Sequence, residues 1–186
     1  DIILIGIFAA LTAIGAFIRI PTPIVPITLQ YLFCAFSGVF LGARRGLYSQ
    51  LLYIGLGLIG VPIFTQGGGP SYIFQPTFGY LIGFIFCAYI IGYFTQSIRE
   101  VKFIKVFIPA VAGLMVVYSI GVSYMYIILR YYLAQPFTFS AAIKVGFFPF
   151  VIQDTCMSAL IAITATKVVP ALRKAGYIST HTEKTA

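Results

Sequence analysis

The sequence predicts an all-α membrane protein, a compact bundle of six transmembrane helices with both termini in the cytoplasm. Three observations lead to this prediction. Of the 186 residues, 60% are hydrophobic and only 9% are charged, whereas soluble domains carry about 25% charged residues. The apolar stretches are long enough for spanning helices of ~20 residues, and the alternation typical of barrel strands is absent. The basic residues gather on one side of the predicted spans.

Six apolar stretches are separated by charged segments or by segments rich in glycine and proline. Residues 19–27, RIPTPIVPI, contain three prolines and are too rigid for a helix. Two arginines close the second span, and a charged loop follows the fourth. We expect one membrane domain over residues 1–174 and a polar C-terminal tail over 175–186. The spans are predicted at residues 2–18, 28–43, 46–59, 75–95, 106–129 and 145–168.

The distribution of basic residues predicts the orientation in the membrane. An even number of spans places both termini on one side. Cytoplasmic loops carry the excess of Lys and Arg, so the richer side is expected to be cytoplasmic. The net charge of +8 therefore indicates orientation in a prokaryotic cell membrane and not a nucleic-acid partner. The terminal side has nine basic residues against three outside: Arg44, Arg45, Arg99, Lys102, Lys105, Lys167, Arg173, Lys174 and Lys184 against Arg19, Arg130 and Lys144.

One uncharged run of 53 residues, from Gly46 to Ile98, must turn once in the membrane. Its turn contains Gly67, Gly68 and Gly69, with aromatic residues around it and none of the charges of a water-exposed loop. Glycine permits close approach of backbone to a ligand. A tight flexible turn is the alternative. We interpret the stretch as one wall of a ligand pocket at the outer face, beside the proline-rich segment.

Asp154 is the one acidic residue inside a predicted span. A carboxylate there costs about 2.5–3.5 kcal/mol even on mild insertion scales, so it normally faces the bundle interior and has a partner. A purely structural acid is the alternative. In the outer half of its span, this carboxylate can accept hydrogen bonds from N–H groups of a small ligand.

Other polar and aromatic groups lie near the predicted outer ends of the spans. Each alone is more often structural, and Tyr is a common interface anchor. If these groups line one cavity together, that cavity suits a neutral or amphipathic ligand of modest size. With Asp154 and the three glycines, the candidate binding residues are Gln30, Tyr53, Phe64, Tyr72, Thr77, Tyr80 and Lys144.

The sequence contains no set of residues that indicates catalysis. No His lies in a span to activate a hydroxyl nucleophile, no cluster has metal-ligand spacing, and no nucleotide-binding motif occurs. We expect neither an enzyme nor a bound cofactor. In the first span, Ala9 and Ala13 form a small-xxx-small pair that permits close helix contact. Internal packing and docking onto a separate membrane subunit are both open for this pair.

Several motifs together resemble those of the BioY family, the biotin-binding S components of energy-coupling factor (ECF) transporters. They spread over about residues 25–154, and their combination is more specific than any one of them. The matching elements are VPITLQ at 25–30, LGARRG at 41–46, GVPIF at 60–64, GGG at 67–69, PTFGYLIGF at 76–84, and PF with Asp at 149–154.

The resemblance implies six helices, a biotin pocket near the outer face and a lid between the first two spans. It implies that Asp154 binds the ureido N–H groups of biotin, which is cargo and not a cofactor. It further implies a transmembrane T component and two ATPase subunits as partners, with Ala9 and Ala13 contacting the T component. Some members of the family work without these partners.

One position departs from the family pattern. Many members have Asp-x-x-Lys in the sixth span, whereas here Met157 follows Asp154. A positive partner for Asp154, or for the biotin carboxylate, is therefore missing, and Lys144 or Arg19 is a possible substitute. The alternatives are an S component or solitary facilitator for another small vitamin or precursor and, from a different class, a membrane scaffold or enzyme.

Overall fold

The computed structural model describes residues 2–22 and 24–175. Within them the chain forms seven α-helices, two short helical turns and a small hairpin. The elements are α1 (Ile2–Phe17), β1 (Arg19–Ile20), β2 (Ile27–Thr28), α2 (Gln30–Leu41), α3 (Ala43–Ile59), the 3₁₀ turn η1 (Pro70–Phe74), α4 (Phe78–Thr95), α5 (Phe103–Ile127), the π-helical turn η2 (Ile128–Tyr132), α6 (Phe139–Gly146) and α7 (Phe148–Lys174).

The predicted all-helical membrane fold is confirmed. Three helical segments are long and apolar enough to cross a membrane, namely α4, α5 continued by η2, and α7. Each of the other three predicted spans coincides with one shorter helix, α1, α2 or α3. Of the predicted tail, only Ala175 lies within the described residues.

A seventh helix, α6, lies where the sequence analysis expected only a connecting segment. It begins at Thr138, whose Oγ1 accepts a hydrogen bond of 3.2 Å from the backbone N–H of Ala141. This is ordinary N-capping by a threonine. The helix ends at Phe147, and α7 starts directly afterwards with Pro149 in its first turn. Proline is well tolerated in that position because it needs no intrahelical partner for an N–H.

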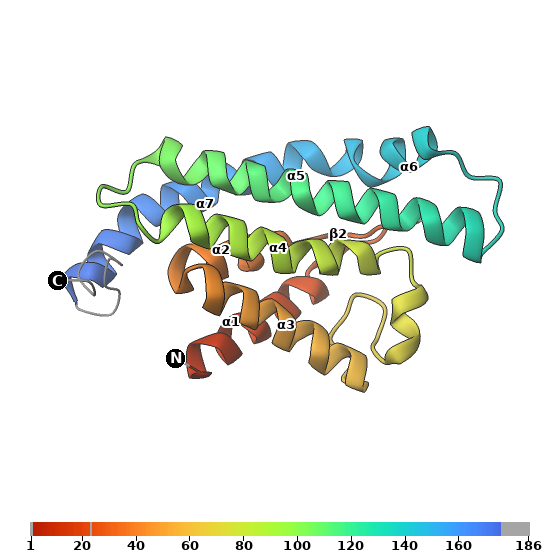
Figure 1. The fold of residues 1–186 in the computed structure, drawn as a ribbon, viewed down its shortest axis with the longest axis horizontal. Helices are drawn as coiled ribbons and strands as arrows, with labels where there is room; N and C mark the ends of the chain where they lie inside the picture. The colour runs from red at the N-terminus through yellow and green to blue at the C-terminus, as the bar shows by residue number, and fades with distance from the viewer. Residues whose placement is uncertain (1, 23, 176–186) are drawn as a thin grey trace.

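The helices run roughly along the long axis of the molecule, and the connections between them lie at its two ends (Figure 1). The start of α1, the α2–α3 junction, the α4–α5 loop and the end of α7 lie at one end of the molecule. The η1 turn and the α5–α6 connection lie at the other. The antiparallel hairpin pairs Arg19 with Thr28 and Ile20 with Ile27.

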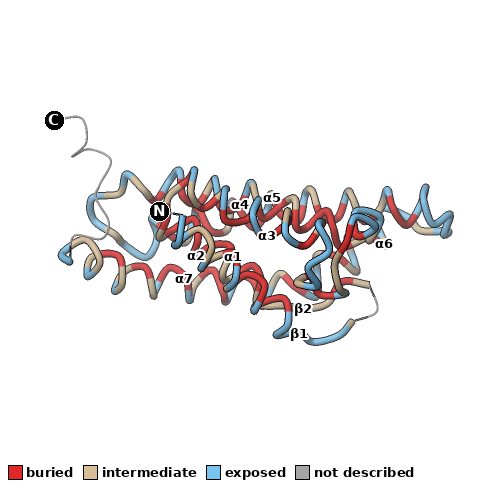
Figure 2. The backbone as a smooth tube through the Cα atoms, turned by 90° about the horizontal axis from the view of Figure 1, so that it is seen from below, coloured by how far each residue is buried: buried red, intermediate tan, exposed pale blue. Residues whose placement is uncertain are grey.

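Small residues bring the helices into close contact. A β-carbon on Gly83 of α4 would lie 2.8 Å from the Cα of Val117 on α5, and one on Gly92 would lie 2.4 Å from the Ala43 nitrogen. Buried stretches concentrate where helices face one another, and exposed residues lie around the outside (Figure 2). Large apolar side chains such as Ile152, 75% exposed, belong to that outer surface, as expected for a protein solvated by lipid.

Ala9 and Ala13 belong to the buried core, with 4% and 8% of their surface exposed. Their side of α1 is buried where α1 packs on α2 and α3. The structure therefore uses this small-residue pair for internal packing, one of the two roles left open by the sequence. Neither alanine presents much surface to a separate subunit, and that contact remains a prediction.

Candidate ligand cavity

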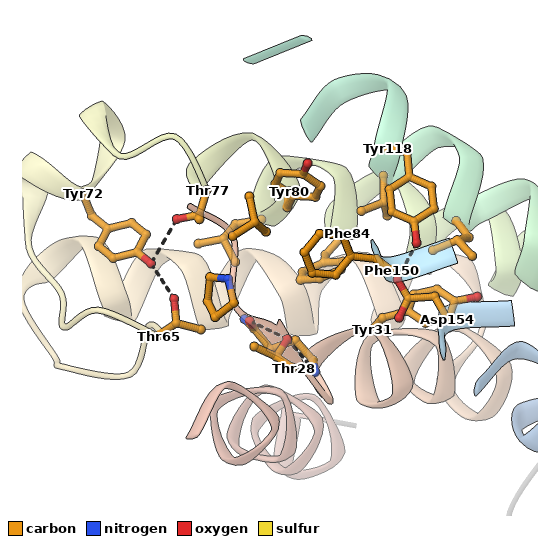
Figure 3. A pocket seen from close by; sticks show the side chains of 16 residues that line it. Thr28, Tyr31, Thr65, Tyr72, Thr77, Tyr80, Phe84, Tyr118, Phe150 and Asp154 are labelled. Atoms are coloured by element: carbon orange, nitrogen blue, oxygen red, sulfur yellow. Dashed lines mark hydrogen bonds between the residues drawn. The ribbon is translucent and has the colours of Figure 1, made fainter. Parts of the chain in front are cut away.

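A cavity of about 600 Å³, including the open space at its mouth, lies between α2, α4, α5, α7 and the segments around β2 and η1. Small-molecule pockets are mostly apolar, with a few placed polar groups. This cavity has that character, and Figure 3 shows its lining. It is lined by Val25, Pro26, Thr28, Gln30, Tyr31, Thr65, Tyr72, Thr77, Tyr80, Leu81, Phe84, Leu114, Val117, Tyr118, Phe150 and Asp154.

Asp154 provides the one acidic group of the lining. It lies on α7 and is 9% exposed. The Tyr118 hydroxyl on α5 donates a hydrogen bond of 2.6 Å to its Oδ2. Within the described residues, Oδ1 receives no hydrogen bond, and no Lys or Arg lines the cavity. A buried carboxylate with unused acceptor capacity favours a ligand that brings N–H donors.

A hydrogen-bonded floor holds Asp154 in place. The Ser158 hydroxyl donates to the Asp154 backbone carbonyl at 2.8 Å and lies 2.7 Å from the Tyr31 hydroxyl. The Tyr31 hydroxyl also lies 3.0 Å from the carbonyl oxygen of Ala110 on α5. These contacts connect α2, α5 and α7 beside Asp154. They fix the backbone that carries the carboxylate.

Gln30 is the first residue of α2, and both the oxygen and the nitrogen of its side-chain amide form hydrogen bonds. Its Nε2 donates to the Tyr53 hydroxyl at 2.9 Å, and its Oε1 accepts from the Thr28 hydroxyl at 3.1 Å. Tyr53 in turn donates to the carbonyl oxygen of Ile63 at 3.0 Å. Tyr53 thus lies behind the wall and orients Gln30. The amide keeps a second N–H, since each amide nitrogen carries two.

Three buried hydroxyls form a cluster, the hydroxyl trio of Thr65, Tyr72 and Thr77. The Tyr72 oxygen lies 3.0 Å from Thr65 Oγ1 and 3.4 Å from Thr77 Oγ1. Figure 3 shows the trio and the Asp154–Tyr118 pair at opposite ends of the cavity, with Tyr80 and Phe84 between them. The cavity is therefore polar at both ends, and between them aromatic rings lie opposite the polar side chain of Thr28 (Figure 3).

Tyr80 lines the cavity with its ring, while its hydroxyl is bonded elsewhere. It donates to the carbonyl oxygen of Gly146, at the end of α6, over 2.9 Å. Glycines make room for it, because a β-carbon on Gly121 would lie 2.5 Å from the ring and one on Gly146 would lie 2.3 Å from the hydroxyl oxygen. This residue ties α4 to α5 and to the α6–α7 junction.

The glycine triplet shapes the loop and does not itself line the cavity. Gly67 and Gly69 have φ angles of +111° and +110°, in a region that side-chain-bearing residues rarely adopt. A β-carbon on Gly68 would lie 2.2 Å from the carbonyl oxygen of Val61. The Gly69 N–H also donates to Gly57 at 2.7 Å. This compact loop carries Thr65 to the wall, so the glycines act through their backbone shape.

Phe64 and Lys144 also lie off the lining. Phe64 is 1% exposed and packs between two rings, edge-on to Tyr53 at 5.4 Å and tilted against Tyr72 at 4.4 Å. It supports the wall from behind. Lys144 is exposed on α6. Of the candidates from sequence, the structure brings Gln30, Tyr72, Thr77, Tyr80 and Asp154 together around the cavity.

The end of α5 fixes the η1 turn that carries Tyr72. The Tyr124 hydroxyl donates to the carbonyl oxygen of Ile73. In the π-helical turn η2, Tyr132 stacks on Phe74 with ring centroids 4.8 Å apart. Short π-helical turns in long helices often occur at functional sites. One wall of the cavity is thus positioned by a neighbouring helix tip.

Several lining residues were not predicted from the sequence, above all Tyr31, Thr65 and Tyr118. A signal was available for Tyr118, because it falls in the middle of the predicted span 106–129 and not at the interface where tyrosine is common. Tyr31 lies near the start of its predicted span, where tyrosine is ordinary. Thr65 gave no comparable signal. Within the described residues no cluster of three metal-ligating side chains occurs.

The fold and the site define a helical, multi-pass membrane protein with a partly buried cavity for a small amphipathic ligand. Comparison with known proteins narrows this class. The BioY family model matches residues 1–174, and the chain belongs to the BioY family. It is therefore a component of membrane transport and not an enzyme.

Two relatives and one solved structure illustrate the similarity. The chain is 42% identical to the probable biotin transporter BioY of Lysinibacillus sphaericus, covering 94% of this chain and 89% of that protein. It is 38% identical to the biotin transporter BioY of Thermotoga maritima, covering 88% and 94%. The crystal structure of an S-component for biotin from an ECF-type ABC transporter superposes with a TM-score of 0.78 at 22% identity, covering 91% of this chain and 90% of that one.

Proposed function

We propose that this chain is the biotin-binding S component of a vitamin uptake transporter. The relatives described above are named as biotin transporters. The observation that carries the proposal is the Asp154 carboxylate, held by Tyr118 and without a basic partner in the lining. Biotin has a ureido ring with two N–H donors, an apolar fused ring system and a carboxylate tail. These three parts correspond to the acidic end, the aromatic and aliphatic side chains between the ends, and the opposite polar end of the cavity (Figure 3).

The proposed mechanism is capture of the ligand, with no covalent chemistry. Asp154 accepts ureido N–H groups, and the spare N–H of Gln30 is available to a ligand oxygen. Phe84, Phe150 and the aliphatic residues of the lining enclose the fused rings. The apolar burial supplies affinity, and the polar groups fix the orientation of the ligand.

We further propose that the described bundle crosses the membrane six times, as one domain over residues 1–174, with both termini in the cytoplasm. The basic side chains support this orientation. Arg173 donates from Nη1 to the carbonyl oxygen of Arg99 at 2.9 Å, which brings the end of α7 against the α4–α5 loop. Lys102 belongs to the same loop, so these basic groups share one end of the molecule.

We propose an ECF T component and two ATPase subunits as partners. The chain has no nucleotide-binding motif, so ATP-driven uptake needs a separate ATPase. A solitary facilitator is the second candidate. Co-expression with the coupling subunits of the same organism, followed by co-purification and a vesicle uptake assay, separates the two. Uptake by this chain alone would exclude an obligatory ATPase.

Equilibrium binding of labelled biotin to the purified protein tests the proposed function. We expect wild-type protein to bind biotin at micromolar concentration or tighter. Asp154→Asn should lower the biotin affinity by about 100-fold or more, because it weakens the charge-assisted hydrogen bond to the ligand and also affects the buried Tyr118 hydroxyl. Glu100→Gln is the matched control, since Glu100 is an exposed acid in the α4–α5 loop. Unlabelled dethiobiotin should compete, whereas thiamin and riboflavin should not. Wild-type protein that does not bind biotin at micromolar concentration overturns the assignment.

A further inference from the structure

We propose that the hydroxyl trio of Thr65, Tyr72 and Thr77 binds the carboxylate of the ligand, so that this anion is held by neutral donors and not by a basic side chain. The inference rests on the proposed function. It names the partner of the biotin carboxylate, which lacks a basic partner because Met157 stands where many family members have Lys. It also fixes the orientation of the ligand in the cavity.

The lining of the cavity contains no cationic side chain. None of the lining residues is Lys or Arg. The two basic residues that the sequence offered as substitutes, Arg19 on β1 and Lys144 on α6, are both exposed and outside the lining. At the position where many family members have Lys, Met157 is 8% exposed and packs in the hydrophobic core. A ligand carboxylate inside the cavity therefore needs donors of another kind.

Electrostatic repulsion from Asp154 disfavours a ligand carboxylate at its end of the cavity. Two like charges about 4 Å apart repel by about 4 kcal/mol at an effective dielectric constant near 20. A ligand carboxylate therefore avoids the Asp154 end and moves toward the other polar end. The hydroxyl trio occupies that end (Figure 3).

The hydroxyl trio has more protons than its internal hydrogen bonds use. The trio has three hydroxyl protons, one per residue. Two hydrogen bonds connect its members, one between Tyr72 and Thr65 and one between Tyr72 and Thr77, and each uses one of the three protons. At least one proton is therefore uncommitted within the described residues, although all three side chains are at least 91% buried, with exposures of 9%, 4% and 7%. Hydroxyls can rotate to point their remaining protons at an incoming carboxylate.

The position of Thr77 adds to this arrangement. Thr77 is the N-cap residue of α4, yet its side chain makes no capping hydrogen bond. Its hydroxyl is therefore not used by the helix and stays available to the cavity. The first turn of an α-helix also has a partial positive charge that favours an anion nearby. Both features suit a carboxylate at this end.

Binding of biotin and of its neutral methyl ester tests the inference. We expect wild-type protein to prefer biotin over the ester. In Thr65→Val, Tyr72→Phe and Thr77→Val, biotin affinity should fall by about tenfold or more per hydroxyl removed, since hydrogen bonds to charged groups contribute ~1.5–3 kcal/mol. The affinity for the ester should change much less, which also shows that each variant is folded. Arg19→Gln and Lys144→Gln are matched controls that should retain the preference for biotin.

The outcomes separate this inference from the proposed function. If wild-type protein binds biotin and its ester equally tightly, or if Arg19→Gln or Lys144→Gln removes the preference, the trio does not bind the carboxylate while the biotin assignment stands. If wild-type protein binds neither compound, the proposed function fails and this inference fails with it. Loss of the preference in the three hydroxyl variants alone supports the inference.

Discussion

Tyr118 on α5 donates a hydrogen bond of 2.6 Å to Asp154 on α7, so the acidic group of the cavity is held by a neutral side chain from another helix. A cation in that place would neutralise the carboxylate. A phenol orients it and leaves its charge in place. The ligand therefore meets a carboxylate that is fixed in direction and has Oδ1 open to new donors.

Removing the phenol hydroxyl should weaken binding less than removing the carboxylate. In Tyr118→Phe we expect biotin affinity to fall by about tenfold. This is the effect expected when Asp154 loses the one hydrogen bond that orients its carboxylate. Tyr89→Phe is the control, because Tyr89 is 40% exposed on α4 and away from the lining. Titration calorimetry of both variants checks this. Equal biotin affinities for Tyr118→Phe and wild type would show that biotin binding does not depend on the orientation of Asp154 by the Tyr118 hydroxyl.

A single methyl group at Gly57 should destabilise the loop that forms the wall. A β-carbon there would lie 2.1 Å from the Phe64 ring, so Gly57→Ala must displace a fully buried ring. Overpacking of this kind costs about 1–3 kcal/mol. Gly55→Ala on the same helix is the control, with no atom within 4 Å of the added carbon. Thermal unfolding in detergent should show a lowered midpoint only for Gly57→Ala, and an equal midpoint for both variants would contradict the packing described.

The Tyr80 hydroxyl should contribute to stability more than to ligand recognition. Tyr80→Phe leaves the Gly146 carbonyl without this donor, at a cost of about 1–3 kcal/mol for a buried group left unpaired. We expect a lower unfolding midpoint with biotin affinity changed by less than about threefold, since the ring that lines the cavity is retained. A large loss of biotin affinity with an unchanged unfolding midpoint would show that the Tyr80 hydroxyl forms a hydrogen bond with the ligand.

The two roles of the alanine pair on α1 can be separated experimentally. Because Ala9 and Ala13 are buried, Ala9→Leu and Ala13→Leu should lower the unfolding midpoint of the isolated protein, at about 1–3 kcal/mol for overpacking. Ala10→Leu, at an exposed position of the same helix, should not. If instead the first two variants keep full stability but no longer co-purify with a coupling subunit, the pair serves the partner contact and not the core.

Biotin should stabilise the folded protein in proportion to its saturation. At a concentration of 100 Kd, a ligand that binds only the folded state adds about 2.7 kcal/mol to the free energy of unfolding. The cavity is lined from α2, α4, α5 and α7, so the gain should appear in the single global transition. Asp154→Asn should show little of this gain at the same concentration. A stabilisation that survives in Asp154→Asn would place the ligand elsewhere.

Much of the helical framework could be predicted from the sequence, because long apolar stretches have few structural options in a membrane. The predicted span at residues 75–95 corresponds to α4, Phe78–Thr95, and that at 2–18 to α1, Ile2–Phe17. The helix α6 was not predicted, since its eight residues lack the length of a span. Its start depends on one capping hydrogen bond at Thr138, which is a weak signal in a sequence.

The candidate site could be predicted only in part. Asp154 stood out because an acid in an apolar span is costly. The glycines at 67–69 stood out too; their φ angles and backbone contacts make them the scaffold of the loop, and they are not among the lining residues. Tyr53 and Phe64 likewise support the wall from behind. Which residues face a cavity and which stand behind it depends on helix rotation, which hydrophobic composition alone does not determine when all sides of a helix are apolar.

The stacking of Tyr132 on Phe74, with Tyr124 bonded to Ile73, has a consequence for how ligand preference can evolve. We expect substitutions at the tip of α5 to shift η1, and with it Tyr72, while the identity of every residue that lines the cavity stays the same. Selectivity can therefore drift through positions that no inspection of the binding surface would mark. A mutational library aimed at a new vitamin should include residues 124–133 alongside the cavity itself.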